Sequence, residues 1–348
     1  MSVGLAVEVI PYALPFRKTY TAAPGSIRRR ELVLLRIRDE DGLEGLGEAV
    51  PLSLRGGAGL EAVVSALEGW GALAGQGSSD PPEAPPPARC AVATALADLE
   101  AKRLGIPLHQ LLGDGAGARE VRCNATVGGG EPGEVAGRAG ELAAQGFSRV
   151  KLKVGLPGDE EAVEAVRGEV GDGVRLRLDA NGAWTPEEAL AFVERIGPEG
   201  IELLEQPTPD LAGLAAVRAS TGIAVVADES VSTPEEALTA ARMEACDAAT
   251  VKISKVGGLD GTLGGHLPLY LSSALDGPVG IAAAGHLATT MPVDGPTGPV
   301  FHGLATAALF DGTIATVEAR MDGEILRLPD GPGIGVELDH SALERFRL

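Results

Sequence analysis

The chain has 348 residues, 45% of them hydrophobic, which is enough to build one large domain or two with a sizeable core. Its formal net charge is −20 and its pI about 4.7, which argues against a protein that binds the phosphate backbone of nucleic acids. It has no apolar run of membrane-spanning length, no signal-peptide pattern, and three scattered cysteines without metal or disulfide spacing. We therefore expect a protein of the reducing cytoplasm that binds neither nucleic acid nor membranes.

The first third of the chain predicts a small α+β domain. Two strands and two helices are expected there, over residues 3–10, 32–38, 59–73 and a stretch that ends at Gly113. The turn at Asp41-Gly42 favours a hairpin or meander. A proline-rich break at 76–89 separates the two helices. We assign this domain to residues 1–115.

From about residue 120, short apolar strands alternate with amphipathic helices, which is typical of βαβ units around a parallel sheet. The expected helices cover residues 131–145, 158–169, 186–196, 210–220 and 233–243. No GxGxxG motif follows a first strand, so a dinucleotide-binding fold has no support.

Charged residues at successive strand ends favour a closed barrel over an open sheet. Asp179, Glu205, Asp228 and Lys252 follow one another about 25 residues apart, roughly the length of one βα unit. In a (β/α)8 barrel the carboxyl ends of all strands converge on one mouth, whereas an open sheet spreads them along a line. We therefore expect an α/β fold with a modified (β/α)8 TIM-type barrel over residues 116–321.

Three carboxylates that converge within one mouth would repel one another, and a hard divalent cation relieves that repulsion. Mg²⁺ prefers oxygen ligands and keeps some waters for a substrate. We expect a Mg²⁺ site, with Mn²⁺ as a substitute, on Asp179, Glu205 and Asp228. Each acid taken alone is about equally well explained as an N-cap of the following helix. A metal site better explains why all three acids stand at the ends of successive strands.

Lysines flank the three acids along the chain. In "VKLKVG", Lys151 and Lys153 alternate with apolar residues and precede the acids, and Lys252 follows them. A substrate carboxylate on the metal would have its α-carbon between these two sites, where a neutral lysine can remove the α-proton. A neighbouring ammonium and the cation would lower the pKa of such a lysine. A solvent-facing edge strand is the alternative for "VKLKVG", and we expect Lys255 on a loop or the outer face.

These residues lie in five motifs: Lys-x-Lys at 151–153, "DANGAW", "EQP", "ADES" and "VKISKVGG". Together the motifs resemble the enolase superfamily, and within it the muconate-lactonizing-enzyme subgroup. The resemblance implies an α+β capping domain, completed by about 322–348, over a modified barrel. It also implies Mg²⁺ on the three acids and Lys153 and Lys252 as acid/base groups. Asn181 and Glu229 belong to the same pattern as residues that orient the ligands, with a turn residue and a helix N-cap neighbour as the alternatives.

The subgroup contains cycloisomerases, dipeptide epimerases, N-acylamino acid racemases and o-succinylbenzoate synthases, which share the enolate step. Residues 272–288 most resemble the synthases, and the resemblance assigns Ser273 and Asp276 there to substrate binding. We therefore expect a small carboxylate substrate and the synthase reaction, a dehydration in menaquinone biosynthesis. A dipeptide or N-acylamino acid epimerase is the alternative, followed by a muconate-type cycloisomerase. Residues 301–312 lack the Asp-x-Asp pair with which dipeptide epimerases typically hold an α-ammonium.

Four further expectations concern the rest of the molecule. A non-catalytic barrel is disfavoured because the acid triad and the lysines are intact, and we expect a homo-oligomer. Specificity is expected in capping loops near Phe16–Thr21 and Leu52–Gly57. Residues 259–268 are glycine-rich and leave room for at most a short helix, so the sixth barrel helix should be stunted or irregular.

Overall fold

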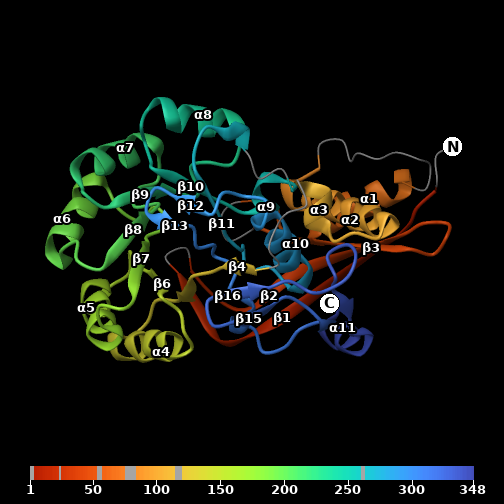
Figure 1. Ribbon diagram of the computed structural model, residues 1–348, viewed down its shortest axis with the longest axis horizontal. Coiled ribbons are helices and arrows are strands. Elements are labelled where there is room, and N and C mark those ends of the chain that lie inside the picture. Colours follow the sequence, from red (N-terminus) through yellow and green to blue (C-terminus); the bar gives the residue numbers. More distant parts are fainter. Residues whose placement is uncertain (1–3, 23–24, 53–56, 75–83, 114–119, 260–262) are drawn as a thin grey trace.

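The computed structural model describes residues 4–22, 25–52, 57–74, 84–113, 120–259 and 263–348. Figure 1 shows an antiparallel sheet with its helices beside a larger part built on parallel strands. We call the first part, which comprises β1–β3 and α1–α3, the cap. The predicted division at residue 115 falls within 114–119, outside the described residues, so this boundary stays a prediction.

The cap is a three-stranded antiparallel sheet covered by helices. Its strands are β1 (Ala6–Ala22), β2 (Gly25–Arg38) and β3 (Glu44–Ala49), and its helices are α1 (Leu60–Ala74), α2 (Pro86–Leu104) and α3 (Leu108–Leu112). Leu35, Trp70 and Leu99 lie in the core between sheet and helices. α2 approaches β3 so closely that a Cβ on Gly47 would lie 1.9 Å from the carbonyl oxygen of Ala91. Only glycine allows this packing.

The first two strands are longer than the sequence predicts. Of the expected strands 3–10 and 32–38, residues 6–10 and 32–38 lie in a hairpin that continues through polar residues, and Tyr20 pairs with Ile27 near its tip. Residue 3 lies outside the described part of the chain. Phe16–Thr21, expected as a loop, therefore lies within β1. Backbone pairing extends the strands where no apolar alternation marks them, because ladder hydrogen bonds do not depend on side-chain polarity.

The parallel sheet forms a closed barrel. Its order is β11-β10-β9-β8-β7-β6-β5. The strands are β5 (Ala125–Val127), β6 (Arg149–Lys153), β7 (Arg175–Asp179), β8 (Ile201–Glu205), β9 (Ala224–Ala227), β10 (Ala248–Val251) and β11 (Leu269–Leu271). His302 and Gly303 bridge the two edges: Gly303 N donates to Leu271 O at 2.7 Å and Asn124 N donates to His302 O at 2.9 Å. This extended segment occupies the eighth position, which confirms the expected modified barrel.

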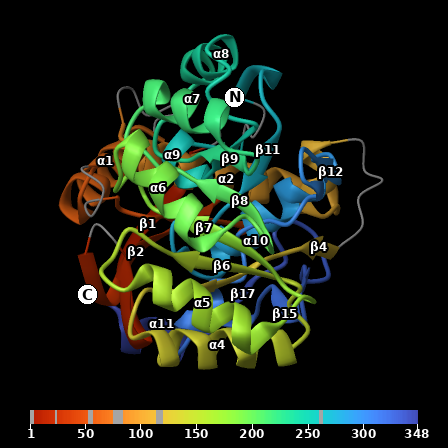
Figure 2. The same ribbon diagram turned by 90° about the vertical axis from the view of Figure 1, so that its left-hand side faces the viewer.

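Amphipathic helices cover the outside of the strands, and several of them stand in front of the sheet in Figure 2. They are α4 (Pro132–Ala144), α5 (Asp159–Val170), α6 (Pro186–Ile196), α7 (Leu211–Ser220) and α8 (Pro234–Arg242). The helix after β11, α10 (Pro278–Ala288), differs from these because it is buried along its whole length. α6, α7 and α8 have Thr185, Asp210 and Thr233 as their N-caps. The three acids at the preceding strand ends are therefore not the helix caps that the alternative interpretation required.

The sixth helix is irregular, as expected from its glycine-rich sequence. In its place the described residues form α9 (Ile253–Val256), a single turn, and the 3₁₀ turn η2 (Leu263–Gly265). Residues 260–262 of the expected stretch lie outside the described part of the chain.

The C-terminal segment returns to the cap. It contains β12 (Asp294–Gly295), β13 (Gly298–Pro299), η3 (Ala307–Leu309), β14 (Ala315–Val317), β15 (Arg320–Asp322), β16 (Ile325–Arg327), β17 (Glu337–Leu338) and α11 (His340–Phe346). β16 pairs with β4 (Glu120–Arg122), and Leu348 N donates to Pro11 O at 3.0 Å. Residues Ile10, Leu32 and Leu34 of the cap belong to the same apolar core cluster as the barrel.

A buried polar junction also joins cap and barrel. Glu48 of β3 accepts a hydrogen bond from the Tyr12 hydroxyl at 2.6 Å and one from Gly277 N, at the start of α10, at 2.6 Å. Burial and the nearby charge of Asp276 raise the pKa of Glu48 to about 7. Glu48, a residue of the cap, thus accepts a hydrogen bond from the N-terminal end of a barrel helix.

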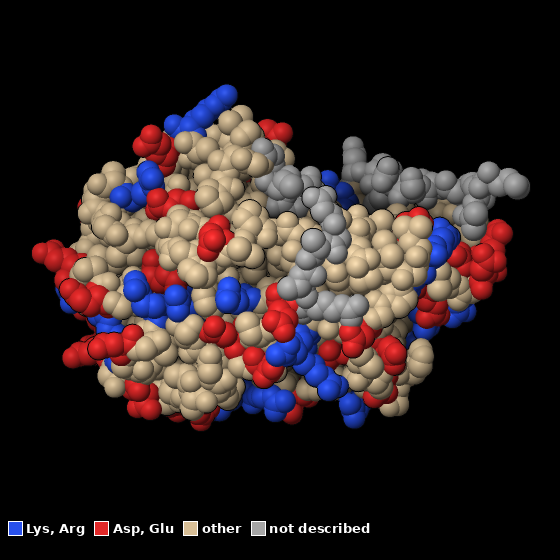
Figure 3. All heavy atoms as spheres, in the orientation of Figure 1, with Lys and Arg blue, Asp and Glu red and all other residues tan. Residues whose placement is uncertain are grey.

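The described surface carries charges of both signs. On the face drawn in Figure 3, the described acidic and basic side chains are interspersed, without a continuous basic stripe. None of the described helices is long and apolar enough to cross a bilayer.

Candidate active site

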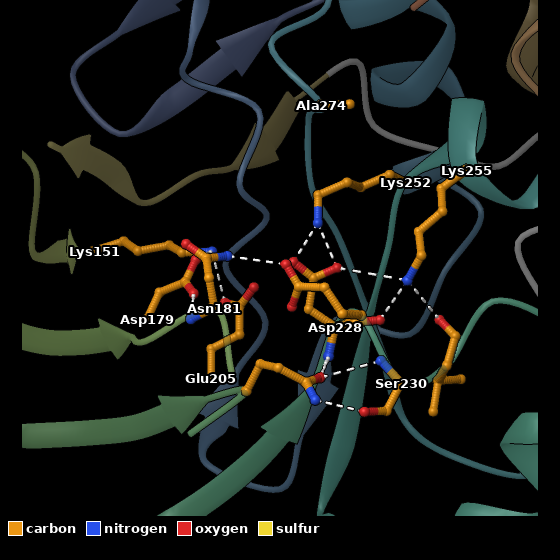
Figure 4. Close-up of polar contacts among 12 residues, drawn as sticks. Lys151, Asp179, Asn181, Glu205, Asp228, Ser230, Lys252, Lys255 and Ala274 are labelled. Carbon is orange, nitrogen blue, oxygen red and sulfur yellow. Dashed lines mark hydrogen bonds and ion pairs between the residues drawn. The ribbon is translucent and has the colours of Figure 1, made fainter. Parts of the chain in front are cut away.

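Parallel pairing brings the charged strand ends to one mouth of the barrel. Lys153, Asp179 and Glu205 are direct neighbours in the registers of β6, β7 and β8. Asp228 and Lys252 follow the last residues of β9 and β10. Ligand atoms of the three acids lie within 4.8 Å of one another, and all three side chains are buried. The close-up in Figure 4 shows these carboxylates with Lys151 on one side and Lys252 and Lys255 on the other.

The first lysine pair contacts the acids directly. Lys151 Nζ lies 2.8 Å from Asp179 Oδ2 and 2.7 Å from Glu205 Oε2, so it bridges two carboxylates. Lys153 Nζ donates to Asp179 Oδ2 at 2.5 Å and to Asn181 Oδ1 at 2.9 Å. Both side chains are almost fully buried, which excludes the solvent-facing edge strand considered above.

The second lysine site lies on the other flank. Lys252 Nζ contacts both carboxylate oxygens of Asp228. Lys255 also points towards this site, which corrects the expectation that it lies on a loop or the outer face. Its Nζ donates to Asp228 O at 2.6 Å because the single-turn helix α9 places it on the same side as Lys252.

Asn181 links the first flank to the turn after β9. Its Nδ2 donates to Glu229 Oε1 at 3.0 Å, and its main-chain N donates to Asp179 Oδ1 at 3.0 Å. Its positive φ of 49° is typical of a turn, as the alternative interpretation expected. Asn181 is therefore a turn residue that also contacts Lys153 and Glu229 in the site.

The acids and lysines of the site shift one another's pKa values. Burial raises the pKa of Asp179, but the ammonium groups of Lys151 and Lys153 outweigh it and hold that pKa below its usual value. Burial raises the pKa of Glu205; the Lys151 ammonium group opposes this rise, and the charges of Asp179 and Asp228 add to it. Burial lowers the pKa of Lys151, but the three carboxylates more than reverse it. The acid cluster therefore favours the ammonium form of Lys151, whose positive charge offsets part of the charge of the three carboxylates.

The acid cluster has the properties of a metal site. All its donors are carboxylate oxygens, the set that a hard cation such as Mg²⁺ prefers. Among the described residues, the buried atom Glu205 Oε1 has no hydrogen-bond partner. A buried carboxylate oxygen without a partner is costly, and a bound cation would satisfy it.

A cavity of about 420 Å³ lies over the cluster, between barrel and cap. Lys151, Lys153, Lys252 and Lys255 line its floor, with Asp179 and Asp228. From the cap come Tyr20, Ile27, Arg30, Leu52, Gly57, Ala58, Pro86 and Pro87. Both expected capping segments thus contribute lining residues, although 53–56 lie outside the described part of the chain.

Ser273 and Asp276 lie in different positions relative to this cavity. Ser273 is a lining residue, but Asp276 is not. Asp276 is buried behind Ser273 and accepts from Ser273 Oγ at 2.8 Å and Ala274 N at 2.6 Å. The expectation that Asp276 binds the substrate is therefore corrected, because its carboxylate is turned inwards and positions Ser273.

Several lining residues were missed from the sequence, and Arg30 and Thr306 are two of them. Arg30 is buried and its Nη2 donates to Pro51 O at 2.7 Å. In "RRR" (residues 28–30), the side chains of a strand alternate between its two faces, so the sequence could have indicated that one of these arginines is buried. Thr306, whose Oγ1 donates to Ser273 Oγ at 2.8 Å, follows the barrel-closing segment and has no comparable signal.

Residues 134–342 match the Enolase C-terminal domain-like family, and the chain therefore belongs to that family. It is 30% identical to the L-Ala-D/L-Glu epimerase of Bacillus subtilis over 374 aligned positions, covering 95% of this chain and 96% of the relative. It is 31% identical to muconate cycloisomerase 1 of Rhodococcus opacus, covering 98% of both. It falls within the muconate-lactonizing-enzyme subgroup of the enolase superfamily.

Solved structures of relatives have the same fold. The substrate-liganded B. subtilis L-Ala-D/L-Glu epimerase superposes with a TM-score of 0.88 at 28% identity, covering 97% of this chain and 100% of the other. The Enterococcus faecalis dipeptide epimerase complexed with Mg and L-Leu-L-Tyr gives 0.84 at 27% identity, with the same coverage. These relatives are epimerases and cycloisomerases, so they favour the alternative expectation over o-succinylbenzoate synthase.

Proposed function

We propose that this protein is a Mg²⁺-dependent epimerase that inverts the α-carbon of an N-acylated amino acid or dipeptide. The observation that carries the proposal is the pair of lysines on opposite flanks of the acid cluster, with Lys153 bonded to Asp179 and Lys252 to Asp228. Epimerisation needs one group that removes the α-proton on one face and another that returns a proton on the opposite face. Dehydration on one face would need only one of them.

Asp179, Glu205 and Asp228 would hold the cation, which would stabilise negative charge on a substrate carboxylate. Lys153 and Lys252, in their neutral forms, would each accept the α-proton of one epimer at Nζ and, as ammonium groups, return it to the other. Lys151 would stay protonated between Asp179 and Glu205. The buried floor and the cap above it would exclude water from the reacting carbon.

The cavity lining supports an uncharged or blocked amino end on the substrate. The lining carboxylates Asp179 and Asp228 contact lysines, and Glu229 accepts from Asn181. The other lining residues include the hydroxyl groups of Ser273 and Thr306, the cation Arg30 and apolar side chains of the cap. An α-ammonium would therefore meet a cation and neutral groups, whereas an acyl group would meet donors and apolar surface.

A muconate-type cycloisomerase is the second candidate. The 31% identity to the Rhodococcus opacus muconate cycloisomerase, over nearly all of both chains, favours it. That reaction handles an unsaturated dicarboxylate without an amide, and Arg30 could receive a second carboxylate. The two candidates therefore differ in whether the substrate must contain an α-amino carbon.

The test is α-proton exchange in D₂O with Mg²⁺ present. N-acetyl and N-succinyl amino acids, free dipeptides and cis,cis-muconate are offered separately, and deuterium at the α-carbon and lactone formation are followed by NMR. We expect deuterium in both epimers of an N-acylated substrate, and slower exchange of a dipeptide with a free amino group. Lactone formation from muconate without any α-exchange would support the second candidate and contradict the first.

A further inference from the structure

The turn that carries the third carboxylate is held from two separate elements. We define it as the Asp228 turn, residues 228–231, between β9 and α8. Lys255 of α9 reaches it from one side: its Nζ donates to Asp228 O at 2.6 Å and lies 3.3 Å from Val231 O. Figure 4 shows the side chain of Lys255 pointing towards Asp228.

Gln206 holds the same turn from the end of β8. Its Oε1 accepts from Asp228 N at 2.7 Å and Ser230 N at 3.3 Å, while its Nε2 donates to Ser230 Oγ at 2.5 Å. The side chain is fully buried, and its backbone has a φ of 40°, which is uncommon for a residue other than glycine. Such a conformation persists only where the surroundings over-determine it.

Lys255 makes its hydrogen bonds with main-chain oxygens of the turn and forms only a longer ion pair with the carboxylate of Asp228. Its Nζ is 3.9 Å from Asp228 Oδ1, beyond hydrogen-bond distance. The carboxylate is instead contacted by Lys252. The main chain of Asp228 is thus fixed at both its N–H and its C=O, while its side chain faces the acid cluster.

We propose that Lys255 and Gln206 are positioning residues that clamp the Asp228 turn and so present Asp228 to the metal and to Lys252 together. The inference rests on the proposed function, because the clamp matters for catalysis only if Asp228 is a metal ligand. Partners that orient a metal ligand typically contribute a factor of about 10–100 in metal affinity. The clamp should therefore be visible in metal binding without any substrate.

The first test measures the affinity of the purified protein for Mn²⁺ by the EPR signal of the free ion. We expect Lys255→Met and Gln206→Leu each to weaken binding by about 10–100-fold. Lys255→Arg, which keeps a cationic donor, should recover part of this loss. Lys102→Met is the matched control, because Lys102 Nζ also donates to a main-chain oxygen, Glu44 O at 2.9 Å, but does so in the cap. It should leave the affinity unchanged.

The second test measures amide hydrogen exchange in the metal-free protein. Lys255→Met should speed exchange of the amides of Asp228, Ser230 and Val231 relative to Lys102→Met, because the turn opens more often. Unchanged Mn²⁺ affinity in Lys255→Met and Gln206→Leu would overturn the proposal, and so would unchanged exchange in the turn. A wild-type protein that binds Mn²⁺ but epimerises nothing would contradict the proposed function alone and leave the clamp standing.

Discussion

Lys153 Nζ lies 2.5 Å from Asp179 Oδ2, on the opposite flank of the acid cluster from Lys252 and its partner Asp228. Each lysine proposed to carry a proton is thus held by a different carboxylate of the candidate metal site. Loss of one lysine should leave the other in place, so the two sides can be tested separately.

The first prediction concerns those two lysines. Lys153→Ala and Lys252→Ala should each lose epimerisation by several orders of magnitude, since one general base alone contributes about 10²–10⁴. Each variant should still exchange the α-proton of one epimer with D₂O, and the two variants should retain opposite epimers. NMR of each epimer separately measures this. If both variants retained the same epimer, the assignment of one lysine to each face would be wrong.

The second prediction concerns the metal. Chelation should abolish activity and added Mg²⁺ should restore it, because three buried carboxylates then lose and regain their cation. Glu205→Gln should lose most of the affinity for Mn²⁺, measured by titration calorimetry, because one of the three charged ligands is removed. Full activity in excess chelator would contradict the metal site.

The third prediction concerns Lys151, which bridges Asp179 and Glu205. Lys151→Met leaves two buried carboxylates without their common cation, and breaking a buried pair in this way costs about 3–5 kcal/mol. Urea unfolding in chelator should show this loss, and Mg²⁺ should recover more stability in the variant than in the wild type. We also expect the variant to lower activity less than Lys153→Ala.

Lys102→Met is the control for this experiment, since Lys102 pairs with the buried Asp98 in the cap, away from the acid cluster. Its loss of stability should not depend on Mg²⁺. Equal responses of the two variants to Mg²⁺ would mean that Lys151 does not neutralise a metal site.

The fourth prediction concerns pH and the junction of cap and barrel. Glu48 has a pKa raised from 4.5 to about 7, so between these values the folded protein holds a proton that the unfolded chain has lost. Its contribution to stability is therefore complete below about pH 4.5 and is lost as the pH rises through 7. At 1.36 kcal/mol per pKa unit the full effect is about 3 kcal/mol.

Glu48→Gln removes this titration but keeps an acceptor for Gly277 N. We expect the variant to gain stability over the wild type as the pH rises from 5 to 8, in urea unfolding at a series of pH values. If the free energy of unfolding changed with pH by the same amount in the variant and the wild type over this range, Glu48 would not take up a proton on folding.

The sequence alone determined the barrel and its acid triad. Alternating strands and helices, with a charged residue at each strand end, required Asp179, Glu205 and Asp228 to meet, because parallel strands bring their carboxyl ends to one edge. The glycine-rich stretch 259–268 likewise predicted an irregular sixth helix. These features depend on local pattern and on spacing along the chain, which a sequence states directly.

Only the tertiary structure decided how the site is completed. Lys255 was expected on a loop or the outer face, but it lies in the single turn of α9, which directs it to the Asp228 turn. Asp276 was expected to bind substrate, but it lies buried behind Ser273. Arg30 reaches the cavity only because the cap packs on the barrel. The direction of a side chain at an irregular turn, or across two packed parts, depends on contacts between residues distant in sequence, which periodicity does not encode.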